Sequence, residues 1–198
     1  SWPNGAMSPR PVTLNTWEGN YFDHRLGSLK AQADAAAALG IERFVLDDGW
    51  FGRRDDDTTS LGDWIVDARK YPDGLKPLVD HVTSLGMQFG IWFEPEMINE
   101  ESDLYRAHPD WALKVEGRPF LRSRNQQVLD LTRREVTDYL FDKMSAVLSS
   151  LAISYIKWDM NRDLTHVGGA DGRAVTTAQT RAAQALMARI RAAFPHVE

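Results

Sequence analysis

The sequence predicts an α/β fold of the (β/α)8 TIM-barrel type, and three observations support this prediction. Short apolar runs alternate with segments of helical periodicity about four times along the 198 residues, which predicts a parallel sheet with helices outside it. Polar residues cluster where the predicted strands end, which is typical of barrels. The first strand-to-helix turn has no glycine-rich phosphate fingerprint, so a dinucleotide-binding, doubly wound sheet is the less favoured alternative.

The start of the chain divides into a lead-in segment and the first strand–helix unit. A closed barrel needs roughly 250 residues, so we expect about the first four strand–helix units of one. Residues 1–11 lack periodicity and are interpreted as a lead-in, and residues 12–198 as one partial barrel domain. The first strand is predicted at Val12 to Trp17. A helix follows from Leu26 to Leu39, because leucine and alanine recur there at helical spacing until Gly40.

The middle of the chain continues the same alternation. Apolar runs predict the second strand at Glu42 to Leu46 and the third at Gln88 to Phe93. Between them, leucine and valine at helical spacing predict a helix from Leu75 to Leu85. A short helix from Asp103 to Ala107 and a short strand from Val128 to Leu131 are expected next.

The last third contains two long helices around the fourth strand. Thr132 to Glu135 fits a capping box, which predicts the start of a helix. Its inward face would be formed by Val136, Leu140, Met144, Val147 and Leu151. The fourth strand is predicted at Ile153 to Trp158, and an amphipathic helix from Thr177 to Phe194 ends before Pro195. Another strand is expected to begin where the chain ends.

Composition excludes several classes of protein. A hydrophobic content of 43% and a charged content of 26% are ordinary for a globular domain. The net charge of −5 without a basic stripe argues against a nucleic-acid partner, and no apolar run approaches the roughly 20 residues of a membrane helix. The absence of cysteine excludes disulfides and cysteine-based metal sites. With no signal-peptide pattern, we expect a cytoplasmic location.

Candidate site residues follow each predicted strand. In a barrel, the carboxyl ends of the strands converge on one mouth. Strand alternation places Lys157 and Asp159 on one face, and Ile156 and Trp158 on the other. The set at the mouth would be Trp17, Asp47, Asp48, Trp92, Glu94, Lys157, Asp159 and Asn161.

These residue types suit a neutral, polyhydroxylated ligand. Carboxylates accept hydroxyl hydrogens, lysine donates, and tryptophan covers an apolar sugar face. Glycoside hydrolysis needs two carboxyl groups flanking the bond. Asp159 is the candidate nucleophile, because the adjacent Lys157 would lower its pKa and hold it ionised.

Five motifs lie at or next to the predicted strand ends and loops. They are Leu14-Asn15-Thr16-Trp17-Glu18, Phe44-Val45-Leu46-Asp47-Asp48-Gly49-Trp50-Phe51, Gly90-Ile91-Trp92-Phe93-Glu94-Pro95-Glu96-Met97, Arg124-Asn125-Gln126 and Lys157-Trp158-Asp159-Met160-Asn161. In these motifs the chain resembles the melibiase-type α-galactosidases of glycoside hydrolase family 36, from about Arg10 onward. The motifs occur in the same order as in the family, which makes the resemblance specific.

The resemblance implies hydrolysis of terminal α-D-galactosyl residues of oligosaccharides, with retention through a covalent galactosyl-enzyme. It makes Asp159 the nucleophile and implies no metal or cofactor. The substrate-binding residues that it implies are Asp47 and Asp48 for galactose hydroxyls, Trp17 and Trp92 for the pocket wall, and Arg124, Lys157 and Asn161 for polar contacts. It also implies a homo-oligomer for the full-length enzyme.

The chain departs from the family pattern in what it lacks. The resemblance puts the general acid/base, an aspartate, on a later barrel strand, and it implies β-rich domains on both sides of the barrel. We therefore expect the chain to be a fragment that is inactive or very weak alone. Preference for galactose over N-acetylgalactosamine, and hydrolysis over galactosyl transfer, stay open.

Two other functions remain as alternatives. One is a metal-dependent barrel enzyme with Asp47, Asp48, Glu94 and Asp159 as oxygen ligands, although Lys157 among them argues against it. The other is a non-catalytic half-barrel that binds galactosides. Structural interpretations also exist: Asp47-Asp48-Gly49 has ordinary turn chemistry. The charged run from Arg53 to Asp57 is most simply a solvated loop.

Overall fold

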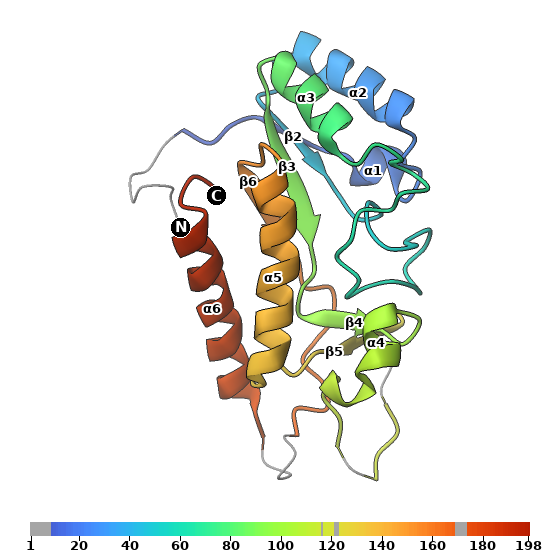
Figure 1. Cartoon of the computed structure of the whole chain (residues 1–198), viewed down its shortest axis with the longest axis vertical. Helices are drawn as coiled ribbons and strands as arrows, with labels where there is room; N and C mark the ends of the chain where they lie inside the picture. The colour runs from blue at the N-terminus through green and yellow to red at the C-terminus, as the bar shows by residue number, and fades with distance from the viewer. Residues whose placement is uncertain (1–8, 116, 121–122, 169–173) are drawn as a thin grey trace.

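Four parallel strands form the central sheet in the order of the chain. The structure, a computed structural model, describes residues 9–115, 117–120, 123–168 and 174–198. The strands are β1 (Thr13–Asn15), β2 (Arg43–Leu46), β3 (Gln88–Phe93) and β6 (Tyr155–Trp158), paired β1-β2-β3-β6 (Figure 1). This order has no reversal, as in a barrel, whereas a doubly wound sheet reverses at a switch point. The predicted parallel α/β fold is confirmed.

Strand alternation gives the sheet two unlike faces. The register pairs Phe44 with Phe89 and Val45 with Gly90, so each pair lies on one face. The outer face carries Leu14, Phe44, Leu46, Phe89, Ile91, Phe93, Ile156 and Trp158. The inner face carries Asn15, Arg43, Val45, Gln88, Gly90, Trp92, Tyr155 and Lys157. The apolar face therefore contributes to the core, and polar side chains line the face that a barrel would enclose.

Helices supply the other half of the core. Figure 1 shows α2 (Leu26–Ala38) beside α3 (Lys76–Ser84), and α5 (Arg134–Ser150) beside α6 (Thr176–Ala193). Their apolar stripes pack with the outer face in one core cluster, where the rings of Phe44 and Phe89 stack. Burying one such side chain stabilises the fold by about 1.5–3 kcal/mol. The predicted bounds of these helices differ from the observed ones by at most two residues.

The structure contains a second, smaller sheet that the sequence did not predict. Strands β4 (Met97–Asn99) and β5 (Gln126–Val128) pair antiparallel, close to the short helix α4 (Asp103–Ala107) and a 3₁₀ turn at Pro109–Trp111. The strand predicted from Val128 to Leu131 is therefore displaced: the observed strand β5 ends at Val128, where the predicted one begins. Three-residue strands leave almost no periodic signal, and this pair is set by contacts distant in the chain.

Two predicted helix and strand boundaries are also wrong. Trp17 does not end the first strand, because it begins the single turn α1 (Trp17–Asn20). The capping box does not form: α5 begins at Arg134, and no side chain caps it at Arg133. The Thr132 hydroxyl instead donates to Asp130 at 2.5 Å. A local turn thus competes successfully for the hydroxyl that the cap would use.

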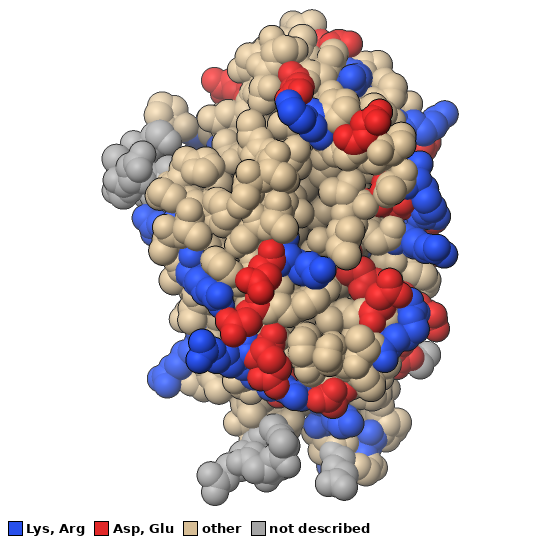
Figure 2. All heavy atoms as spheres, viewed as in Figure 1, with Lys and Arg blue, Asp and Glu red and all other residues tan. Residues whose placement is uncertain are grey.

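The surface agrees with the composition. On the face seen in Figure 2, basic and acidic side chains are interspersed rather than gathered into a patch of one sign. Among the described residues, no helix has the length and apolarity to cross a membrane.

Candidate active site

Asp159 lies at the carboxyl end of β6, in the turn that leaves the sheet. Its N–H donates to the Phe93 carbonyl at 2.8 Å, which extends the β3–β6 ladder by one bond. Its carboxylate accepts from Trp92 Nε1 at 3.0 Å and from the Met160 N–H at 2.9 Å, and Lys157 Nζ is 3.9 Å away. The side chain keeps 28% of its surface exposed, so one region of the carboxylate remains open to a ligand.

The surroundings of Asp159 favour the ionised form. Burial alone would raise its pKa, but hydrogen bonds from Trp92, the Asn161 side chain and the Met160 N–H oppose burial, with help from the charge of Lys157. The net result is a pKa below the ordinary value of aspartate. A carboxylate held ionised and partly exposed is suited to act as a nucleophile.

Asp47 is joined to the same cluster through Lys157. Lys157 Nζ donates to Asp47 Oδ2 at 2.8 Å, and Asn15 Nδ2 donates to the same oxygen at 2.5 Å. The Asp47 side chain is 4% exposed, whereas that of Lys157 is 34% exposed. Lys157 therefore lies between two carboxylates from different strands, as the sequence predicted. Asn15 was not predicted as a site residue, although its place on the inner face of β1 was a usable signal.

Asp48 points to a different partner. Arg54 Nε and Nη2 both donate to its carboxylate at 2.9 Å, which makes a bidentate pair. Arg54 is 1% exposed, so the prediction that Arg53 to Asp57 is a solvated loop is wrong at this residue. No periodic pattern marks an inward residue in an irregular loop. Burial raises the pKa of Asp48 even though Arg54 acts in the opposite direction.

Trp92 belongs to a cluster of aromatic rings at the end of β3. Its ring is 1% exposed and lies 6.0 Å from both Phe51 and Trp64, measured between ring centroids. Trp50 Nε1 donates to the Trp92 carbonyl at 2.9 Å. The cluster thereby fixes the indole so that its N–H points at Asp159. The structure shows Trp92 as a buried donor with little surface left for a sugar.

Glu94 is a buried carboxyl beside the nucleophile candidate. It is 0% exposed, accepts the Asn161 N–H on Oε1 and accepts from Gln126 Nε2 on Oε2 at 3.1 Å. Burial is the largest cause that raises its pKa, and the negative charge of Asp159 adds to it. Asn161 thus acts on both carboxyl groups: its N–H donates to Glu94, and its side chain favours the ionised form of Glu94 and of Asp159.

Trp17 is joined to this cluster only through its backbone, because its N–H donates to Asn15 Oδ1 at 2.8 Å. Neither the Trp17 ring nor Arg124 has a described contact with the cluster. The Trp17 ring is half-buried and packs edge-on against Tyr21 and Phe22, at centroid distances of 5.1 and 5.2 Å. Arg124 is exposed and has a left-handed backbone with φ of 53°. Its neighbour Asn125 is held by Asn99, which donates to the Asn125 carbonyl at 2.8 Å.

The metal-dependent alternative gains no support from this arrangement. Within the described parts of the chain, no group of three histidine, aspartate or glutamate side chains is placed to hold a metal ion. Lys157 donates to Asp47 at 2.8 Å, so a cation already occupies the space between the carboxylates. The residues at the mouth are arranged around a fixed ammonium group.

Comparison with known proteins identifies relatives along almost the whole chain. The melibiase family profile matches residues 3–198. The chain is 52% identical over 189 residues to an α-galactosidase from Escherichia coli, which covers 96% of this chain and 27% of that protein. It is 55% identical over 159 residues to the α-galactosidase AgaA of Geobacillus stearothermophilus, covering 80% of this chain and 22% of AgaA. The chain thus spans about a quarter of the length of these relatives.

Solved structures agree with the sequence relatives. The α-galactosidase AgaB of Geobacillus stearothermophilus, from glycoside hydrolase family 36, superposes with a TM-score of 0.90 at 49% identity, over 95% of this chain and 27% of AgaB. A complex of an AgaA variant with raffinose superposes equally well, with a TM-score of 0.90 at 48% identity, over 95% of this chain and 27% of AgaA. Because the family profile covers residues 3–198, the chain belongs to the melibiase family, as the motifs in its sequence predicted.

Proposed function

We propose that this chain carries the nucleophile half of a retaining α-galactosidase site, with Asp159 as the nucleophile. The observation that carries the proposal is the environment of Asp159. Its carboxylate is partly exposed at the carboxyl end of β6, and donors and the Lys157 charge lower its pKa. A nucleophilic carboxylate must be ionised at the start of the reaction and must reach the substrate, and Asp159 meets both conditions.

The proposed reaction has two steps. An oxygen of Asp159 attacks the anomeric carbon of an α-galactoside, the glycosidic bond breaks, and its oxygen leaves with a proton from a general acid. Water, activated by the same group now acting as a base, then releases galactose from the ester and restores the carboxylate. Trp92 and the Met160 N–H hold the attacking carboxylate in place in both steps.

Substrate recognition would come from the polar residues around Asp159. Asp47, Asp48 and Lys157 can exchange hydrogen bonds with galactose hydroxyls, since each carboxylate oxygen has more than one acceptor position. Terminal α-galactosides of oligosaccharides are the proposed substrates. Complexes of Geobacillus AgaA variants with raffinose and with stachyose support this class.

Neither Glu94 nor Asp47 has the surroundings that a general acid needs. Glu94 has the raised pKa that an acid needs, but it is 0% exposed and both its oxygens bind protein donors. Asp47 is paired with Lys157 at 2.8 Å. We propose that the acid lies outside these 198 residues, in agreement with the position that the family resemblance implies.

A segment exchange tests the assignment of Asp159. The matching segment of the Escherichia coli α-galactosidase is replaced by this chain, and release of nitrophenol from nitrophenyl α-galactoside is measured. We expect turnover by the chimera and a loss of at least about 1,000-fold in Asp159→Asn. A folded chimera that retains turnover after this substitution would contradict the proposal.

The isolated chain separates the enzyme from the non-catalytic alternative. We expect the purified 198-residue chain to release little or no nitrophenol, because the acid is absent. Strong turnover that Asp159→Asn abolishes would show that the acid lies within the chain. Galactose binding by calorimetry, together with an inactive but folded chimera, would favour the galactoside-binding half-barrel.

A further inference from the structure

The turn that carries the nucleophile is attached to β3 at two points. We define the nucleophile turn as Asp159, Met160 and Asn161. Its first residue donates to the Phe93 carbonyl, and its last residue donates through its N–H to Glu94 Oε1. Donors that face one neighbour in a parallel ladder recur every second residue. Asn161 is therefore the next donor after Asp159, and Glu94 receives it.

The Glu94 side chain accepts the Asn161 N–H in place of the main-chain carbonyl that a longer β3 would offer. The regular ladder would need the carbonyl of Pro95, two residues beyond Phe93. The chain has already turned at this point, because the Met97 N–H donates to the Glu94 carbonyl at 3.3 Å. The carboxylate of Glu94 takes the vacant position, so the nucleophile turn stays attached after β3 has ended.

The second oxygen of Glu94 reaches a third segment. Gln126, in β5, donates through Nε2 to Glu94 Oε2 at 3.1 Å. Two N–H donors therefore approach the same side chain from different segments. A carboxylate can accept on both oxygens, whereas a neutral amide has one oxygen and must donate on its other side. A glutamate at this fully buried position can therefore satisfy both donors at once, which offsets part of the cost of burying it.

We propose that Glu94 is a positioning residue that holds Asn161, and through it the nucleophile Asp159, in the reactive orientation. This inference rests on the proposed role of Asp159. The path is short: Glu94 accepts the Asn161 N–H, and Asn161 follows Asp159 by two residues in the same turn. The Asn161 side chain also acts on both carboxyl groups, because it lowers the pKa of Asp159 and opposes the rise in the pKa of Glu94. Glu94 does not contact a substrate at all, because no part of it is exposed.

Two substitutions in the 198-residue chain test the proposal without any need for activity. The probes are hydrogen exchange of the Asn161 amide and the carboxyl pKa of Asp159, both followed by NMR. Glu94→Ala removes the acceptor, so the Asn161 amide should exchange at least tenfold faster. The pKa of Asp159 should be higher in Glu94→Ala than in Glu94→Gln, because both variants remove the Glu94 carboxyl and only the alanine also releases Asn161.

Glu94→Gln should rescue Asn161 through the retained oxygen. The new amide would face Gln126, whose Oε1 is buried without a partner among the described residues and can accept once that amide turns. Glu96→Gln is the matched control, because Glu96 is also buried and holds β6 through Trp158 Nε1 at 3.1 Å. Its substitution should leave both probes at Asp159 and Asn161 unchanged.

Kinetics in the chimera add an independent measurement. Glu94→Ala should lower kcat roughly 10- to 100-fold with little change in KM, since misplacement of a reacting group by about 1 Å has this effect. Unchanged Asn161 exchange in Glu94→Ala, together with the same Asp159 pKa in Glu94→Ala and Glu94→Gln, would overturn the positioning role. An active Asp159→Asn chimera would instead overturn the proposed function and leave the NMR result standing, so the two failures are distinguishable.

Discussion

The two ends of the inner face of the sheet are built from similar residues but have different properties. At the amino end, Arg43 donates to Glu198 at 2.7 Å and to Gln88 at 3.0 Å, and its guanidinium lies 4.4 Å from the centroid of the Tyr155 ring. At the carboxyl end, Lys157 donates to Asp47 at 2.8 Å and lies 3.9 Å from Asp159. Both ends therefore contain a basic side chain between acceptors from neighbouring segments.

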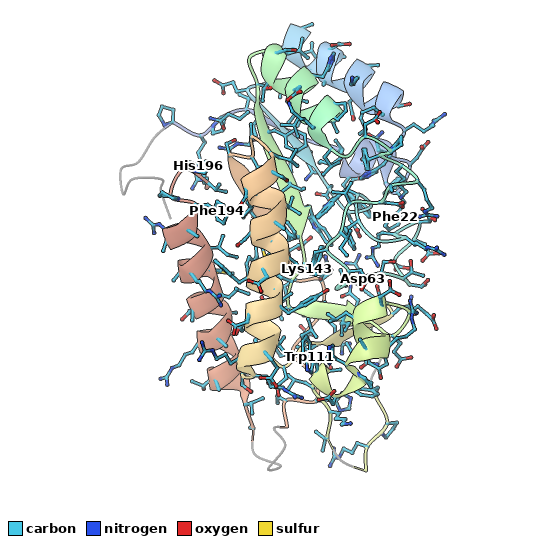
Figure 3. All side chains as sticks on the ribbon, in the orientation of Figure 1. Phe22, Asp63, Trp111, Lys143, Phe194 and His196 are labelled. Atoms are coloured by element: carbon cyan, nitrogen blue, oxygen red, sulfur yellow. The ribbon has the colours of Figure 1, made fainter. Side chains whose placement is uncertain are left out.

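Residual exposure distinguishes the two clusters. The side chains of Arg43 and Glu198 are 7% and 13% exposed, whereas those of Lys157 and Asp159 are 34% and 28% exposed. Figure 3 labels Phe194 and His196 at the end of the chain, just before Glu198. The Glu198 N–H donates to Ser154 there. Groups that satisfy one another stabilise a fold, and groups left partly open can bind a ligand.

The largest expected effect on stability is at the amino end. Arg43→Met should lower the free energy of unfolding by about 2 kcal/mol, because Glu198 then loses its buried partner and keeps only the exposed Arg10, at 2.8 Å, as a cation among the described residues. Lys157→Met should cost only about 1 kcal/mol, since Lys157 is one-third exposed and Asp47 keeps Asn15 as a donor. Urea denaturation of the 198-residue chain measures both.

The pKa of Asp159 should respond more to Lys157→Met than to Arg43→Met, which is the reverse of their order in stability. Lys157→Met removes a charge that lowers the pKa of Asp159, so that pKa should rise. Arg43→Met should leave it unchanged. A larger loss of stability in the Lys157 variant, or an equal pKa change in both, would mean that exposure does not separate the structural pair from the functional one.

An effect that depends on pH is expected from His24 near the carboxyl end. His24 is 2% exposed, and its Nδ1 lies 2.8 Å from the Tyr71 hydroxyl. Burial, aided by the charge of Lys70, lowers its pKa to about 4. The unfolded chain therefore binds more protons than the folded one between about pH 6.5 and 4. Stability is lost as the pH falls through this window, by about 2 kcal/mol between pH 6.5 and 4.5.

His24→Asn should remove this part of the acid sensitivity. Asparagine can place a nitrogen or oxygen near the position of Nδ1 and keep the contact with Tyr71. The check is the slope of unfolding free energy against pH, with His81→Asn as the control because His81 lies at the surface of α3 beside Asp34. The same slope in wild-type and His24→Asn chains would assign the acid sensitivity to other groups.

The sequence predicted regular elements well and irregular ones poorly. The bounds of β3 and α4 were predicted to the residue, because periodic apolar patterns and flanking breakers define such elements locally. The β4–β5 pair was missed, since three residues per strand hold no measurable period. The capping box at Thr132 failed because a neighbouring aspartate competes for the same hydroxyl.

In the candidate site, too, residues on regular strands could be predicted and residues in irregular segments could not. Asp47, Lys157 and Asp159 could be placed together because alternation and strand ends fix their direction. Arg54 could not be predicted, since its inward direction depends on the path of an irregular loop. The role of Glu94 was also hidden, because its acceptor position is defined by where β3 turns away from β6, which is a property of three segments together.

The smallest predicted effect tests whether the two ends of the inner face are coupled through its middle. A Cβ added at Gly90 would lie 2.8 Å from Tyr155 Cδ1 and 3.0 Å from Val45 Cγ2, so a side chain there must displace a neighbour. Gly90→Ala should cost about 1 kcal/mol of stability. Tyr155 is half-buried and can move toward Arg43, which stacks on it. Tyr155→Leu should therefore reduce the cost of Gly90→Ala in a double-mutant cycle.

Because the displacement is directed at the amino end, Gly90→Ala should leave the pKa of Asp159 unchanged while it weakens the pairing of Arg43. A carboxyl titration by NMR in the Gly90→Ala chain measures the first quantity, and the cycle with Arg43→Met measures the second as an interaction energy. A shift in the pKa of Asp159, together with additive effects of Gly90→Ala and Arg43→Met, would mean that the added methyl group displaces residues toward the carboxyl end instead. The packing of the two ends would then be coupled, and their difference in exposure would be insufficient to assign separate roles.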